Sequence, residues 1–212
     1  MHEETNNKLK EIYDKFSNAT KPIHMAYMQS IHSLINLTEA RDPYTKRHSV
    51  KVSSYAVMLA KYIGLPKKEV NIIRLAAILH DIGKVGIKEK VLLKNGTLNG
   101  KEYKEVQKHS ELGAEIIKPL KFFGPIVSII KHHHENYDGT GYPDGLKGEE
   151  IPFASRILAI ADSYDAMTSK RAYREAYDPQ RALEIMKKES GKKFDPALFK
   201  KFLGCLHYNA KG

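Results

Sequence analysis

Apolar residues recur at intervals of three and four along most of this 212-residue chain, which is the spacing of one helix face. Leu9, Ile12, Tyr13 and Phe16 follow this rule near the N-terminus. Alternation typical of strands is scarce, and the sequence contains neither an internal repeat nor a low-complexity tract. The sequence therefore predicts an all-α fold built around one domain.

Proline, glycine and capping residues mark the expected helix ends. Asn99 is an expected N-cap, and Asp178 and Asp195 each precede a proline that suits the first helical position. Residues 1–20 are expected to form an N-terminal amphipathic helix, and residues 21–212 the main domain. Within that domain we expect helices near residues 22–40, 44–62, 66–82, 99–108, 110–118, 125–135 and 152–167, with two more starting at Pro179 and Pro196. The segment DGTGYPDGLKGE is too rich in glycine and proline for regular structure, so we expect a loop there.

The composition indicates the cellular compartment of the protein and the kind of partner it binds. Its one cysteine, Cys205, cannot form an internal disulfide, and no apolar run approaches the roughly 20 residues of a membrane span. The sequence thus predicts a cytoplasmic protein without membrane contact. The net charge of +10 favours an anionic partner. However, many lysines are paired, as in Lys67-Lys68, which is typical of solvated helix faces, so we do not expect a nucleic-acid-binding protein.

One apolar run, LAAILHDIGK, ends in a histidine and an aspartate where a core would hold leucine. Burying His80 or Asp81 without a partner costs a few kcal/mol. Metal coordination removes that cost, and so does a well-made hydrogen-bond network. His48 lies in TKRHSVKV and His109 in QKHSELG, and His132–His134 follow an apolar helical run. Any one of these histidines, taken alone, is more often structural than a metal ligand.

Lys84 adds a positive charge beside this pair. If the helix continues that far, Lys84 lies roughly 40° from His80 and roughly 60° from Asp81 around the helix axis. An ammonium group repels a metal cation, so its presence here indicates an anionic ligand such as a phosphate ester. The alternative is a surface lysine favoured by the helix dipole.

Three motifs follow one another in the sequence: HDIGK, HHENYDGTGYP and AIADSYDAMTS. In this order they resemble the HD-GYP subgroup of the HD-domain phosphohydrolases, over about residues 36–205. The resemblance implies an HD-domain helical bundle with an irregular GYP loop. It also implies a signalling phosphodiesterase that hydrolyses cyclic di-GMP to linear pGpG, and in some members to GMP.

The resemblance further implies a binuclear metal site. Asp81 would bridge two metals, and Glu135 sets the register that makes His133-His134, and not His132, the ligating pair. Such a nitrogen-rich set favours transition metals over magnesium and calcium, and iron or manganese is the family's usual choice. The implied ligands are His48, His80, Asp81 and Asp162 for one metal and Asp81, His109, His133 and His134 for the other. Some relatives bind a third metal through a glutamate at the position of Tyr44, so we expect two metals here.

Substrate contacts are also carried over by resemblance. Tyr142 would face the ligand, Arg171 and Arg174 would pair with its phosphates, and Asp42 is a further candidate. Arginine suits phosphate because its planar fork donates two parallel hydrogen bonds. The alternative for the two arginines is a salt bridge to a nearby carboxylate.

The implied mechanism is attack on phosphorus by a hydroxide held between the two metals. Lys84 would stabilise the transition state or protonate the departing ribose oxygen. Two alternatives stay open: a catalytically weak module that binds cyclic dinucleotides, and an HD-type nucleotide phosphohydrolase. A homodimer, or an upstream sensory or receiver domain, also stays open as a partner.

Overall fold

The computed structural model describes residue 29 and residues 33–37, 45–94, 96–120, 123–170 and 175–209. The chain divides into two compact units, residues 1–37 and 38–212. In the first unit, residues 33–37 are helical. The expected N-terminal helix lies outside the described residues, and its boundary at residue 20 remains a prediction.

Helices account for all the regular elements in the described part of the second unit, apart from an isolated β-bridge between Ser190 and Phe194. The predicted all-α fold is thus confirmed. The α-helices are α2 (Thr45–Tyr62), α3 (Lys67–Leu79), α4 (Glu89–Leu92), α5 (Gly100–Gln107), α6 (His109–Ile117), α7 (Gly124–Lys131), α8 (Phe153–Thr168), α9 (Pro179–Lys188) and α10 (Pro196–Asn209). Two 3₁₀ helices complete the set, η1 (Ile82–Gly86) and η3 (Gly148–Glu150).

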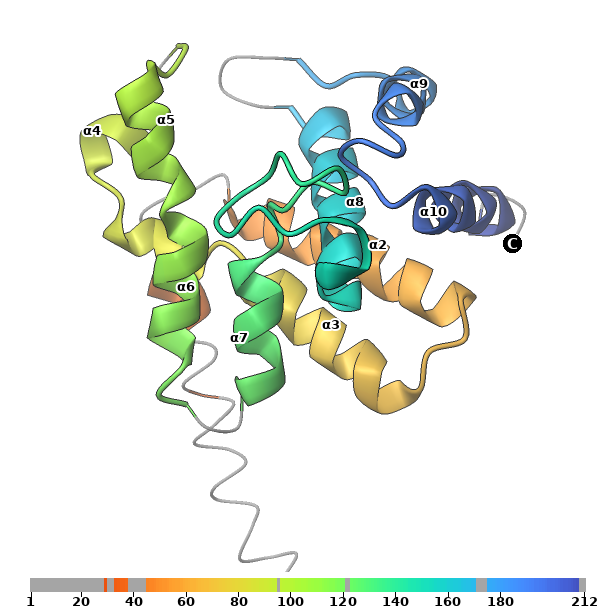
Figure 1. The fold of residues 1–212 in the computed structure, drawn as a ribbon, viewed down its shortest axis with the longest axis horizontal. Helices are drawn as coiled ribbons and strands as arrows, with labels where there is room; N and C mark the ends of the chain where they lie inside the picture. Colours follow the sequence, from red (N-terminus) through yellow and green to blue (C-terminus); the bar gives the residue numbers. More distant parts are fainter. Residues whose placement is uncertain are drawn as a thin grey trace, which may run out of the picture. The chain divides into compact units, whose positions relative to one another are not determined.

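The helices pack around a core in which α2 contacts α3, α8 and α10 (Figure 1). Helix α6 packs against α7 and η1, and α7 also contacts α3. Leu59 of α2, Ile130 of α7 and Ile157 of α8 are fully buried in this core. Segments far apart in the sequence are therefore fixed side by side by apolar packing, and the polar site described below depends on that packing.

Capping residues behave as expected from the sequence. Asn99 forms a capping box with Glu102 at the start of α5. Asp178 accepts a hydrogen bond from the Gln180 N–H at the start of α9, and Asp195 caps α10 in the same manner. These local interactions satisfy backbone N–H groups that have no partner within the helix.

Two helices end earlier than the apolar pattern suggests. Helix α3 ends at Leu79 rather than near residue 82, and α7 ends at Lys131 rather than near residue 135. The Lys84 N–H donates to the Asp81 carbonyl three residues back, so the backbone tightens into η1. The condition under which His80, Asp81 and Lys84 would share one α-helical face, a helix that continues to residue 84, is therefore not met.

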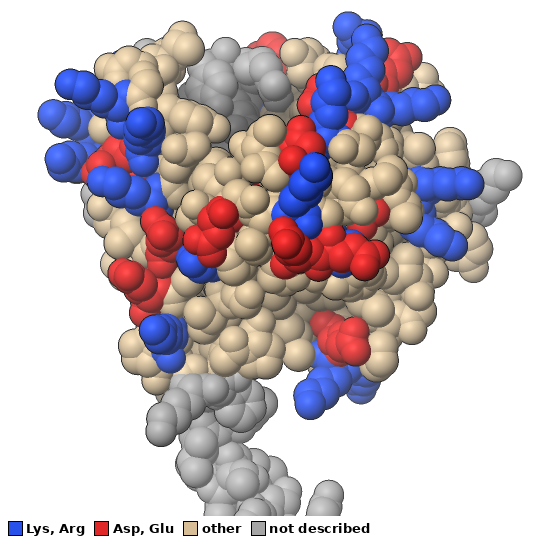
Figure 2. Space-filling view, in the orientation of Figure 1, with Lys and Arg blue, Asp and Glu red and all other residues tan. Residues whose placement is uncertain are grey.

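Basic and acidic side chains occupy different parts of the face shown in Figure 2. Figure 2 shows Lys and Arg gathered towards the margins of one face, over α4–α5 and over α9, with carboxylates across its middle. Among the described helices, none combines the length and apolarity needed to cross a bilayer.

Candidate metal centre

Five segments of the chain converge on one buried cluster of histidine and aspartate side chains. The cluster draws on α2, the turn after α3, the first residue of α6, the turn after α7, and the middle of α8. All seven predicted ligands belong to it: His48, His80, Asp81, His109, His133, His134 and Asp162.

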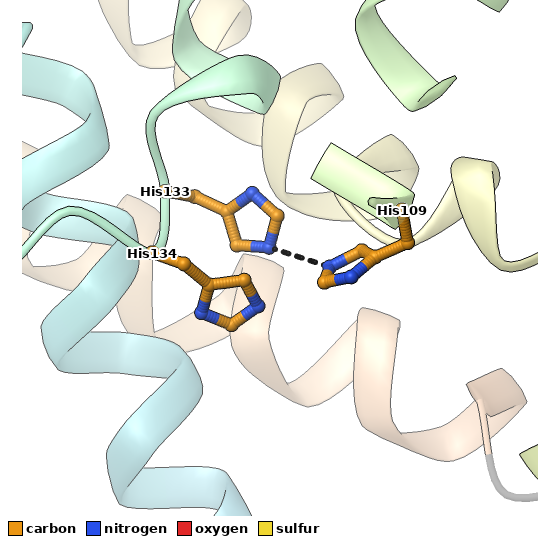
Figure 3. A group of neighbouring side chains, drawn as sticks. All are labelled: His109, His133 and His134. Carbon is orange, nitrogen blue, oxygen red and sulfur yellow. Dashed lines mark hydrogen bonds between the residues drawn. The ribbon is translucent and has the colours of Figure 1, made fainter. Parts of the chain in front are cut away.

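One group within the cluster consists of three imidazoles, His109, His133 and His134. Figure 3 shows the three rings turned towards one another, with His109 coming from α6 and the other two from the chain after α7. The Nε2 atoms of His109 and His133 are 3.4 Å apart. His109 and His133 are buried, and His134 is half-buried.

A second group consists of His48, His80 and Asp162. The His48 Nε2 atom lies 3.1 Å from Asp162 Oδ1, and the rings of His48 and His80 are 5.3 Å apart. This group contains a carboxylate, whereas the first group contains only imidazoles. The two halves of the centre therefore differ in the type of ligand atom that they offer.

Asp81 lies between the two groups. Its Oδ1 atom is 3.6 Å from His109 Nε2, while its Oδ2 atom is 3.4 Å from His80 Nε2 and 4.0 Å from His48 Nε2. The two carboxylate oxygens thus face opposite halves. This is the arrangement that a carboxylate bridging two cations needs.

Three of the histidines are held from behind by the backbone. His80 Nδ1 lies 2.7 Å from the Ala77 carbonyl oxygen, His109 Nδ1 2.7 Å from that of Val106, and His133 Nδ1 2.6 Å from that of Ile130. Because a carbonyl oxygen only accepts hydrogen bonds, each Nδ1 carries the proton and each Nε2 lone pair is left for the centre.

Electrostatics keep the imidazole group ready to coordinate. Burial, with the neighbouring His80 and His109, lowers the pKa of His133 to about 3. Burial likewise lowers the pKa of His134 and of His109. These rings are therefore neutral near pH 7, and neutral imidazole is the form that binds metal.

The carboxylates remain ionised in spite of their burial. Burial raises the pKa of Asp81, but Lys84 and the surrounding histidines outweigh it and hold that pKa well below its usual range. For Asp162, burial also raises the pKa, and His48 reverses the effect. Burial lowers the pKa of His48, but hydrogen bonds to Asp162 and Asp165 raise it to about 9.

The donor set fits the transition metals that the motifs imply. Imidazole nitrogens combined with two ionised carboxylates are typical of zinc, iron or manganese sites, whereas magnesium and calcium prefer oxygen ligands. Hydrogen bonds to the outer ring nitrogens are a recurring feature of histidines that ligate metals.

The GYP loop covers one side of the imidazole group. The Tyr142 ring lies 5.0 Å from the His134 ring, and the Tyr142 N–H donates to the His134 carbonyl. From inside the loop, Glu135 Oε1 accepts hydrogen bonds from the N–H groups of Asp144 and Gly145. Tyr142 is therefore held next to a predicted metal ligand, and its contact with substrate remains a prediction.

His132 takes part in a different set of contacts. Its Nδ1 lies 2.9 Å from the Ser128 carbonyl oxygen, and its Nε2 lies 2.9 Å from Asp144 Oδ2. Lys131 Nζ also reaches Asp144 Oδ2, at 2.6 Å. His132 thus ties the GYP loop to the end of α7, and this geometry agrees with the register that excludes it from the ligating pair.

Lys84 reaches the centre from η1, and its Nζ lies 2.8 Å from Asp81 Oδ2. The positive charge predicted beside the His-Asp pair is therefore present, although a 3₁₀ turn and not an α-helical face provides it. The other predicted substrate residues, Asp42, Arg171 and Arg174, lie outside the described residues, as does Tyr44.

Two polar residues of the site were not predicted from the sequence. Glu135 was used only to set the histidine register, yet it is buried inside the GYP loop. Asp165 is fully buried, and its Oδ2 lies 2.7 Å from His48 Nδ1. Its spacing of three from Asp162, which puts both on one helix face, is the signal that was available.

A comparison with protein-family models identifies an HD domain over residues 32–198. The chain belongs to the HD-domain family. Its predicted resemblance to the HD-GYP subgroup is confirmed by its relatives. Across 170 residues it is 40% identical to the cyclic di-GMP phosphodiesterase response regulator RpfG of Xanthomonas campestris, covering 79% of this chain and 45% of that protein.

Other relatives carry related names. A cyclic di-GMP phosphodiesterase of Thermotoga maritima is 38% identical, with 79% of this chain and 46% of that protein covered. The 3'3'-cGAMP-specific phosphodiesterase 2 of Vibrio cholerae is also 38% identical, with 79% and 33% covered. The HD-domain chain thus spans less than half the length of these curated relatives.

Solved structures support the fold. Bd1817, an HDGYP protein from Bdellovibrio bacteriovorus, superposes with a TM-score of 0.63 at 21% identity, covering 77% of this chain and 52% of that one. The HD domain of Listeria monocytogenes PgpH gives a TM-score of 0.61 at 20% identity, covering 85% and 98%. The predicted HD-domain bundle is therefore confirmed.

Proposed function

We propose that this HD domain is a metal-dependent phosphodiesterase that hydrolyses cyclic di-GMP to linear pGpG, with further cleavage to GMP as a second step. The observation that carries the proposal is the convergence of five histidines and two aspartates in one buried centre, where three Nε2 atoms are freed by backbone hydrogen bonds. The names of the relatives at 36–40% identity support the substrate class.

His48, His80 and Asp162 would hold one metal, and His109, His133 and His134 the other, with Asp81 shared between them. The separate grouping of these side chains and the orientation of the Asp81 oxygens support this division. We propose iron or manganese. Such a pair, when bound, supplies an acidified water and neutralises charge on the phosphate.

The chain's own residues would orient the substrate. Lys84 lies next to Asp81 Oδ2, and its positive charge would stabilise the phosphate oxygen that gains negative charge in the transition state. It would alternatively pass a proton to the departing ribose oxygen when the P–O bond breaks. Tyr142 would contact the ligand from the loop, while Arg171, Arg174 and Asp42 remain predicted phosphate and substrate contacts.

A second candidate substrate is 3'3'-cGAMP. The Vibrio cholerae relative specific for that dinucleotide is 38% identical to this chain, which is close to the 40% of the Xanthomonas protein. The two substrates differ in one purine, so the phosphodiester chemistry is the same. Discrimination would come from contacts to the bases.

The test is a cleavage assay on protein purified without oxygen and supplied with Fe(II) or Mn(II). Cyclic di-GMP, 3'3'-cGAMP and a deoxynucleoside triphosphate are offered in parallel, and products are separated by chromatography. We expect pGpG from cyclic di-GMP, and none from a His133→Ala variant. Tight binding of cyclic di-GMP without product would instead identify a binding module, and phosphate release from the triphosphate a nucleotide phosphohydrolase.

A further inference from the structure

Asp165 occupies an unusual position for a charged residue. It lies on α8, one helical turn after Asp162, and none of its surface is exposed. Its Oδ2 lies 2.7 Å from His48 Nδ1, on the side of the ring that faces away from the centre. A buried carboxylate is costly unless its oxygens have hydrogen-bond donors, so these contacts need to be complete.

Both oxygens of Asp165 are occupied. Ser169 Oγ donates to Oδ1 at 2.9 Å, and Lys51 Nζ in turn donates to Ser169 Oγ at 3.0 Å. Lys51 Nζ also lies 3.9 Å from Oδ1, and its side chain is half exposed. A continuous chain of contacts therefore runs from the surface at Lys51 to the imidazole of His48.

His48 needs such a partner because of its place in the fold. His80, His109 and His133 follow helix ends and use carbonyl groups of the preceding turn. His48 instead lies within α2, where carbonyl groups serve the helix's own hydrogen bonds. A side chain from another helix can hold its Nδ1, and Asp165 of α8 does so.

We propose, on the basis of the function proposed above, that Asp165 is the positioning residue of the His48 half of the metal centre. It fixes the ring and the tautomer of His48, so that Nε2 is presented to a metal. The negative charge also makes the imidazole a stronger donor. Nothing in this role requires Asp165 to touch a metal or the substrate.

The test measures metal binding rather than turnover. Metal-free protein is titrated with Co(II), followed by its visible absorption, for wild type and for Asp165→Asn and Asp165→Ala. The asparagine oxygen can still accept from Nδ1, so we expect Co(II) affinity to fall about tenfold. Alanine removes the contact, and we expect a loss of up to about 100-fold.

Two controls separate positioning from general damage. Asp195→Asn makes the same exchange at another buried aspartate, which pairs with Arg156 and caps α10, so it should lower the melting temperature without changing Co(II) affinity. In a His48→Ala background, Asp165→Ala should have no further effect on Co(II) affinity, because Asp165 influences the metal only by positioning His48.

Wild-type Co(II) affinity in both Asp165 variants would overturn the proposal, and so would an equal loss with and without His48. A wild-type protein that takes up no Co(II) would overturn it as well. A different result would contradict the proposed function alone. If the wild-type protein binds Co(II) but cleaves no cyclic dinucleotide, the proposed function is wrong, while the titrations still test the role of Asp165.

Discussion

Replacing Gly83 by alanine tests whether the close approach of η1 to α6 builds the metal centre. A Cβ at this position would lie 1.8 Å from the His109 carbonyl oxygen and 2.5 Å from the Gly113 nitrogen, and both are backbone atoms. Real Cβ atoms do not come closer than 3.0 Å to such neighbours. The backbones of η1 and α6 must therefore separate by the difference between 3.0 and 1.8 Å, about 1.2 Å.

That separation acts directly on two predicted ligands. Asp81 immediately precedes η1, His109 begins α6, and Asp81 Oδ1 lies 3.6 Å from His109 Nε2. Metal–ligand distances tolerate only about 0.2 Å of change, so a shift of this size prevents both residues from serving the same metal. Overpacking costs about 1–3 kcal/mol, which lowers the melting temperature by roughly 2–12 °C.

The assay compares metal content by elemental analysis, cyclic di-GMP hydrolysis and thermal unfolding in Gly83→Ala and Gly100→Ala. Gly100, the first residue of α5, has nothing within 4 Å of an added Cβ, so alanine there should leave all three quantities unchanged. If Gly83→Ala matches this control in metal content and melting temperature, the inferred coupling between backbone contact and metal centre is wrong.

Four further substitutions address single residues. His133→Ala should lose bound metal and all cleavage activity, whereas His132→Ala should retain its metal. Equal metal contents in the two variants by elemental analysis would contradict the prediction that His133, and not His132, is a metal ligand. Glu135→Ala leaves the Asp144 and Gly145 N–H groups without their acceptor. In urea titrations it should lower the free energy of unfolding by about 1–3 kcal/mol. A change below about 0.5 kcal/mol would show that the GYP loop does not depend on Glu135. Lys84→Ala should reduce kcat by about 10²–10³ with metal content intact, and an unaltered kcat would remove Lys84 from the mechanism.

Features set by neighbouring residues were predictable from the sequence. The caps at Asn99, Asp178 and Asp195 depend on contacts within three residues, and all three were confirmed. The ends of α3 and α7 were not, because the apolar pattern continues past both. At α3 the change to a 3₁₀ turn accompanies the contact of Gly83 with α6, which no local pattern records.

In the candidate site, too, some features were predictable from local sequence and others depend on long-range packing. The motif order named the seven residues that meet in the cluster, but their proximity depends on the packing of helices far apart in sequence. Asp165 was missed because its contact spans 117 residues, and a carboxylate on α8 gives no local sign of the histidine it will meet. Its position three residues after Asp162 places both carboxylates on one helix face, but the sequence does not show that His48 of α2 packs against that face.

The histidines of the centre are positioned by two different means, with consequences for its stability. The last carbonyl groups of a helix have no acceptor role in a continuing helix, and His80, His109 and His133 each donate to such a carbonyl three residues back. The same bond aims Nε2 at the centre, so these rings are positioned by short-range contacts. His48 depends instead on Asp165, and hence on the packing of α2 against α8. Conditions that loosen this packing should therefore disrupt the His48 half of the centre before the imidazole half.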